Sequence, residues 1–173
     1  MLLRTLALEG AAVAGMRGDL ERALTEAEAA VDGCRLAGDQ LRAALALALV
    51  GDALFAVGQL SHASHHYAEA LDGLDRPASQ WAYANTLLSA GHGDLLRGSA
   101  AERVATGSGA QSLASGRAMI DEGLRIAGLI GADLLTCRGQ RLLATQWPVD
   151  PSAAQQAVSA AAAAARAGVT AFE

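Results

Sequence analysis

The chain has 173 residues, 52% of them hydrophobic, 18% charged and 3% aromatic, and a formal net charge of −5 at pH 7. A chain of this length and composition suits one folded domain and is too apolar to stay disordered. Its acidic balance argues against direct nucleic-acid binding, which depends on cationic neutralisation of phosphates.

Helix is the only regular structure that the sequence predicts. Sustained alternation of apolar and polar residues is absent, and long stretches of Ala, Leu, Glu and Arg favour helix. Gly, Pro or Asp clusters interrupt these stretches, and Asp19 and Asp39 are expected to cap the helices that follow them. The expected helices span residues 2–14, 19–37, 40–57, 60–74, 78–96, 110–130, 132–145 and 151–167.

Short links between these helices predict antiparallel hairpins. We therefore expect a single all-α domain over residues 1–173 that forms an α-solenoid of about four hairpins. The third is expected to contain a loop insertion near residues 98–109. The expected hairpins lie near residues 2–37, 40–74, 78–130 and 132–167.

An internal repeat supports the solenoid. Placing residues 18–20 over residues 58–60 gives a period of 40 residues. The same superposition pairs Ala23 with Ala63, Ala27 with Tyr67, Ala30 with Ala70 and Val31 with Leu71. A period in this range is typical of helical solenoids, in which each hairpin leaves an apolar face that its neighbour covers.

The second hairpin resembles a tetratricopeptide repeat. Its first helix matches the signature positions with Leu47, Val50, Gly51 and Leu54, and its second helix with Ala63, Tyr67 and Ala70. The small residues stand where helices approach most closely. The first hairpin matches through its alanines, the third only loosely, through Trp81, Leu88, Gly116, Ile120 and Gly123, and the fourth only as a hairpin.

The period of 40 residues is more like the degenerate repeats of large bacterial transcriptional regulators than the 34-residue repeats of chaperone adaptors. In those regulators a nucleotide-binding module usually precedes the repeats, and a helix-turn-helix lies at one end. This sequence contains neither a GxxxxGK[ST] loop nor a convincing helix-turn-helix. The resemblance therefore implies either the repeat portion alone or a stand-alone relative.

Both ends of the expected stack lack the polar faces that terminal repeats need. Leucines mark residues 2–8, and alanines dominate residues 153–167. We therefore predict that the chain forms a homo-oligomer or belongs to a longer polypeptide, with these segments covered.

Two features point away from secretion and membranes. Residues 1–15 are apolar enough to suggest a secretory signal, but Arg4 and Glu9 interrupt the run, and a first hairpin helix is favoured. No uncharged apolar run reaches the roughly 18 residues that a membrane-spanning helix needs. We expect a cytoplasmic protein without a membrane partner.

No residue pattern indicates a metal, a cofactor or catalysis. His62, His65 and His66 could place two imidazoles on one helix face, but only Glu69 could add a ligand, and these histidines are expected on the exposed side. Residues 106–112 lack the preceding strand and the third glycine of a dinucleotide loop. Cys34 and Cys137 are far apart, so free thiols are expected. The chain is therefore not expected to be an enzyme.

The resemblance also implies a partner-binding surface, because the first helices of a tetratricopeptide stack line its concave groove. The candidate residues are Leu45, Asp52, Phe55, Tyr83 and Thr86. Ala48 and Asp52 do not match the Lys and Asn that grip a carboxylate in chaperone-binding members. Phe55 fits the core between repeats equally well. The expected function is a scaffold for a protein or peptide in a bacterial regulatory protein, and the alternative is a sensor domain that binds a small effector.

Overall fold

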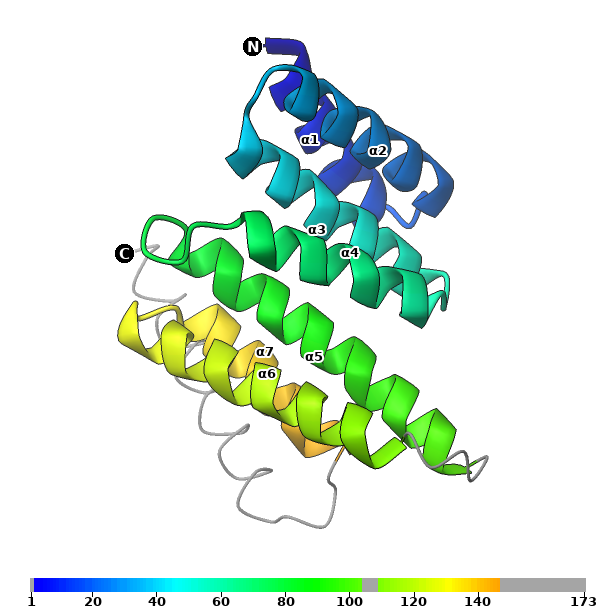
Figure 1. Ribbon diagram of the computed structural model, residues 1–173, viewed down its shortest axis with the longest axis vertical. Helices are drawn as coiled ribbons and strands as arrows, with labels where there is room; N and C mark the ends of the chain where they lie inside the picture. The colour runs from blue at the N-terminus through cyan, green and yellow to red at the C-terminus, as the bar shows by residue number, and fades with distance from the viewer. Residues whose placement is uncertain (1, 104–108, 147–173) are drawn as a thin grey trace, which may run out of the picture.

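The computed structural model describes residues 2–103 and 109–146, and all regular structure within them is helical (Figure 1). The prediction of an all-α fold is confirmed for this part of the chain. Its helices are α1 (Leu2–Met16), α2 (Leu20–Leu36), α3 (Gln40–Ala56), α4 (Leu60–Gly73), α5 (Gln80–Arg103), α6 (Gly109–Leu129) and α7 (Asp133–Gln146). The helix expected at residues 151–167, and with it half of the fourth hairpin, lies outside the described residues.

The third pair of helices differs from the prediction. A loop insertion was expected near residues 98–109, but α5 continues to Arg103 and α6 begins at Gly109. Gly98 is a packing residue and not a helix breaker, because a Cβ there would lie 2.9 Å from the carbonyl oxygen of Gly109. A Cβ on Gly91 would likewise lie 2.7 Å from the carbonyl oxygen of Gly116. These glycines let α5 and α6 approach closely over most of their length.

The same tight turn ends several helices. Gly38, with φ of +67°, follows α2, and the backbone N–H of Asp39 donates to the carbonyl oxygen of Cys34 at 2.9 Å. This is the hydrogen bond of a Schellman motif. The motif needs a left-handed residue after the helix, and glycine adopts that conformation most easily because it has no Cβ. Equivalent bonds follow Gly18 and Gly58, so the turn recurs at 20-residue intervals, and a related turn follows Gly131.

The turn residues also start the next helices. The side chain of Asp19 accepts from the backbone N–H of Arg22 at 3.3 Å, and that of Asp39 accepts from Arg42 at 3.2 Å. Each carboxylate satisfies a donor that the first helical turn would otherwise leave free. The predicted caps at Asp19 and Asp39 are confirmed. Gln59 occupies the same position before α4 without a side-chain cap.

The helices pack in chain order as antiparallel neighbours (Figure 1). The backbones of the odd-numbered helices also approach each other in the order α1, α3, α5 and α7. The backbones of α2, α4 and α6 make no such approach in the described part of the chain, although Arg35 of α2 forms an ion pair with Glu69 of α4. We call the odd-numbered helices the inner layer and the even-numbered helices the outer layer. The links from α2 to α3, from α4 to α5 and from α6 to α7 lie along one edge of the stack (Figure 1).

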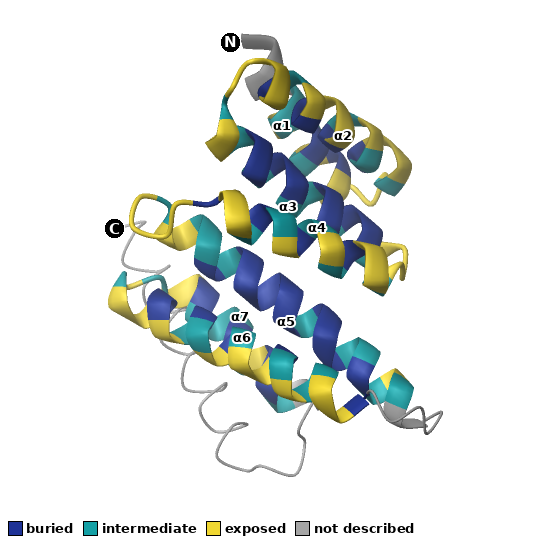
Figure 2. Ribbon diagram, viewed as in Figure 1, coloured by how far each residue is buried: buried dark blue, intermediate teal, exposed yellow. Residues whose placement is uncertain are grey.

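Small residues bring the two layers together. Ala27, Ala46, Ala63 and Ala70 are fully buried or nearly so, and buried positions face neighbouring helices throughout the stack (Figure 2). A Cβ on Gly51 would lie 2.6 Å from the ring of Tyr67, so this glycine makes room for the largest buried side chain. The predicted close contact at Gly51 and Ala63 is therefore confirmed.

Two glycines, one in a turn and one in a helix, provide a stability test. Replacing them with alanine should change the free energy of unfolding in opposite directions. Gly38→Ala should lower the free energy of unfolding by about 1–2 kcal/mol, because a Cβ is unfavourable at positive φ. Gly128→Ala, at an open helical position of α6 with no atom near the added Cβ, should raise it by up to about 1 kcal/mol. Urea unfolding of both variants measures these changes, and destabilisation by Gly128→Ala of equal size would contradict the assignment.

Candidate partner-binding groove

A hollow of about 290 Å³ lies where α1, α3 and α5 of the inner layer meet. Its lining residues are Leu8, Glu9 and Ala12 from α1, Leu45, Ala48, Leu49 and Asp52 from α3, and Trp81, Ala82, Asn85 and Thr86 from α5. A second hollow of about 340 Å³ shares Ala12, Leu49 and Asp52 with it. A third, of about 400 Å³, shares Leu45, Trp81 and Ala82. We call these three adjacent hollows the inner groove and the first of them the central hollow.

The structure brings three of the five candidate residues together in this hollow. Leu45 and Asp52 are half-buried and line it from α3, and Thr86 lines it from α5. The hydroxyl of the buried Thr86 donates to the carbonyl oxygen of Ala82 at 2.9 Å. Thr86 therefore contributes to the shape of the groove more than to its hydrogen bonding.

Phe55 is not a lining residue of the inner groove. Its ring packs against His92 of α5, with centroids 4.9 Å apart and planes tilted by 43°. It also packs against the apolar cluster that the first four helices form with Ala90 of α5. Phe55 is thus a half-buried contact between α3 and α5, which matches the core alternative of the sequence analysis.

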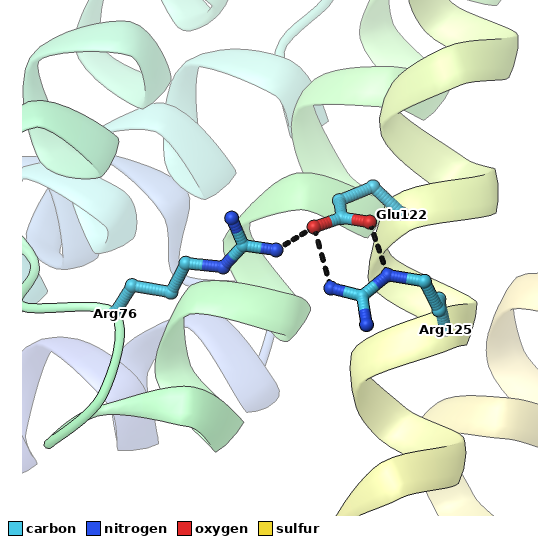
Figure 3. A network of polar contacts seen from close by, with 3 residues as sticks. All are labelled: Arg76, Glu122 and Arg125. Carbon is cyan, nitrogen blue, oxygen red and sulfur yellow. Dashed lines mark hydrogen bonds and ion pairs between the residues drawn. The ribbon is translucent and has the colours of Figure 1, made fainter.

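Tyr83 also lies away from the groove. The guanidinium of Arg76 sits over its ring at 5.7 Å from the centroid. Arg76 also pairs with Glu122 of α6, which accepts from Arg125 at 2.6 and 2.9 Å (Figure 3). This partly exposed network ties the α4–α5 link to α6, and such surface pairs contribute little to stability individually.

Sequence reasoning missed Trp81 and Asn85 as groove residues. Trp81 was matched to a repeat signature position, yet 57% of it is exposed. The period of 40 residues points to Asn85 as a groove residue, because it maps the candidate Leu45 onto Asn85. The same period maps Tyr83 onto Ala43, which is buried. Strict use of the period would have favoured Asn85 over Tyr83.

A polar network forms the floor of the groove. The buried Tyr67 of α4 donates its hydroxyl to Oδ1 of Asp52 at 2.7 Å. Burial raises the pKa of Tyr67 well above its ordinary value, and the nearby carboxylate of Asp52 raises it further. On the α7 side, Arg138 donates to Ser89 at 2.7 Å and to the side-chain oxygen of Asn85. The network therefore links α3 to α4, and α5 to α7, directly beneath the groove.

The α7 side of the inner layer is basic. Burial lowers the pKa of His92 below its ordinary value, and the positive charges of Arg138 and Arg141 act in the same direction. His92 therefore favours the neutral form at neutral pH. Arg138 and Arg141 supply positive charge near His92 on this side, whereas Glu9 and Asp52 line the groove on the α1–α3 side.

The histidines of α4 lie on the outer layer. His62 and His65 are exposed, and His66 is half-buried, with a pKa lowered chiefly by burial and also by His65. Within residues 2–103 and 109–146, no three His, Cys, Asp or Glu side chains gather closely enough to hold a metal ion. None of the helices described is both long and apolar enough to cross a membrane. Cys34 is buried, and both cysteines are free.

The chain matches no protein-family model, and no curated protein matches its sequence significantly. The functional argument therefore rests on the geometry and chemistry of the groove. Three features matter for it. Its hollows are adjacent and share lining residues, it has an exposed indole in its wall, and its two carboxylates lie on one side.

The position of Phe55 generates a stability prediction. Phe55→Ala should lower the free energy of unfolding by about 2–3 kcal/mol, less than the loss for a fully buried aromatic, because the ring is half-buried. Thermal and urea unfolding measure the loss. His62→Ala, at an exposed position on α4, is the control and should stay within about 0.5 kcal/mol. A loss at Phe55 no larger than the control would place this ring in solvent.

The raised pKa of Tyr67 generates a pH prediction. The unfolded chain releases the phenol proton above about pH 10, while the folded chain retains it, so the free energy of unfolding should fall as pH rises. Tyr67→Phe should flatten this fall by up to about 1.4 kcal/mol per pH unit. Urea unfolding between about pH 9 and pH 11 compares the slopes, and parallel slopes would contradict the prediction.

Proposed function

We propose that this chain is a tetratricopeptide-like α-solenoid whose inner groove binds a protein or peptide segment within a bacterial, cytoplasmic regulatory protein. The chain-order packing of helical pairs and the direct contacts within the inner layer support the solenoid. The 20-residue recurrence of the turn supports it independently. The proposal assigns the chain a binding role and no catalytic step.

The observation that carries this proposal is the exposed indole of Trp81 in the wall of the groove. Trp81 is 57% exposed, and Leu41, with 45% exposed, joins it in lining the third hollow. Exposed apolar surface on rigid helices is a common feature of interaction sites, and Trp is enriched among the residues that dominate binding energy. A partner side chain could therefore bury apolar area here without reorganising the stack.

The apolar surface continues along the edge formed by the links to the odd-numbered helices. Exposed large apolar residues at or near these links are Leu36, Leu41, Trp81, Leu129 and Leu134. Leu41, Trp81 and Leu134 each stand second in their helix, so the inner layer repeats an apolar residue at equivalent places. This edge is the surface that we expect a macromolecular partner or a second copy to cover.

A second candidate function is the binding of a small effector by the same groove. The central hollow supports it, because its volume of about 290 Å³ is close to the lower limit of small-molecule sites, which is roughly 300 Å³. Such sites are mostly apolar with a few polar groups, as this hollow is. An effector bound there would touch α1, α3 and α5 together and could bias the stack between two arrangements.

Partner binding can be tested with the full chain. Once a partner has been isolated by co-purification, Trp81→Ala and Leu45→Arg should each weaken its affinity by roughly tenfold or more, as expected for a central contact. Helicity and the unfolding midpoint should change little. His62→Ala on the outer layer is the control and should leave affinity unchanged. Calorimetry measures the affinities. If the unmodified chain and the three variants bind the partner equally well, the partner does not bind in the inner groove.

A further inference from the structure

We propose that the central hollow is a binding site for a small organic cation with an apolar body. Asp52 and Glu9 supply the counter-charge, and Trp81 supplies an aromatic wall. This proposal rests on the small-effector function above and gives that effector a chemical class. It does not depend on a macromolecular partner docking along the groove.

The charges around the hollow favour a cation. Glu9 and Asp52 line it, and no basic side chain is among the described residues that line it. Neither carboxylate forms an ion pair with any residue in the described part of the chain. Both negative charges are therefore available to a ligand that enters between α1 and α3.

The structure also holds one of these carboxylates in place. Tyr67 donates to Oδ1 of Asp52 at 2.7 Å, which fixes the orientation of the carboxylate. Within residues 2–103 and 109–146, Oδ2 of Asp52 receives no side-chain hydrogen bond. Asp52 thus presents one oriented and unused oxygen to the groove, while Glu9 on α1 is exposed and can adjust to the ligand.

The walls determine which cations fit. Leu8, Leu45 and Leu49 line the hollow beside Trp81, so most of the surface that a ligand touches is apolar. A small hydrated ion gains little by leaving water for such walls. A cation with an apolar body buries its surface against the leucines and places its charge near the indole face and the carboxylates.

The basic side chains lie beyond the hollow. The guanidinium of Arg138 is bound by the side chains of Asn85 and Ser89 on α5. Asn85 therefore separates the hollow from Arg138, and Arg141 lies on the same α7 side. An anion would be drawn toward α7, which gives the test a clear opposite outcome.

Two ions of similar size and opposite charge test the proposal. Phenyltrimethylammonium and benzenesulfonate each carry one phenyl ring, are small enough for the hollow and differ in the sign of their charge. With the full chain carrying Trp147→Phe, the fluorescence of Trp81 reports binding, and calorimetry of the unmodified chain checks it. We expect the cation to change the fluorescence and to bind at least about tenfold more tightly than the anion.

Matched variants locate the charge. Asp52→Asn keeps an acceptor for Tyr67 but removes the negative charge, and should weaken cation binding by about fivefold. Glu9→Gln should weaken it less, because Glu9 is exposed. Asp72→Asn, an exposed carboxylate of α4 outside the groove, is the control and should leave affinity unchanged. Circular dichroism and the melting temperature confirm that each variant is folded.

Three outcomes would overturn the proposal. Equal binding of both ions, or an unchanged affinity in Asp52→Asn, would indicate nonspecific apolar association. Tighter binding of the anion would assign the charge preference to Arg138. Absence of binding by either ion would exclude the site. None of these results affects docking of a protein partner through Trp81 and Leu45, which the co-purified partner tests separately.

Discussion

A left-handed glycine turn sets the geometry on which the whole stack depends. Each of the turns at Gly18, Gly38 and Gly58 closes one helix with a Schellman hydrogen bond and starts the next helix within two residues. The short link forces consecutive helices to run antiparallel, and the constant 20-residue interval gives them similar lengths. Successive links then alternate between the two edges of the stack (Figure 1), and the odd-numbered helices contact each other in chain order.

Close packing of small residues determines what that layer can offer. Where alanine and glycine fill the contacts, the helices approach closely, and few large side chains are needed inside. Tyr67 is the largest of the fully buried side chains in the described residues, and its ring lies against Gly51 while its hydroxyl reaches Asp52 in the groove. Arg138 connects α7 to α5 in a similar way. The polar atoms of the groove are therefore oriented by α4 of the outer layer and by α7 of the inner layer.

The two proposed functions use the same surface, but their ligands would cover different amounts of it. A peptide would lie along the inner groove and its apolar edge, whereas a small cation would occupy only the central hollow. Either ligand would contact α1, α3 and α5 at once, and within the inner layer these helices contact each other in chain order. Binding would therefore restrain the relative positions of the first three pairs of helices. That restraint is a physical route by which a repeat domain could transmit the bound state to whatever it is attached to.

The sequence by itself determined the helices, the caps at Asp19 and Asp39, and the close contact at Gly51, because hydrogen bonds and steric limits over a few neighbouring residues decide these features. Through the resemblance to a tetratricopeptide repeat it also singled out Leu45 and Asp52, which line the central hollow. Only the tertiary structure decided the rest. The exposure of Trp81 and the contact of Phe55 with His92 depend on how α5 is rotated against α3. Local sequence does not encode that rotation, because it results from packing between helices that are far apart along the chain.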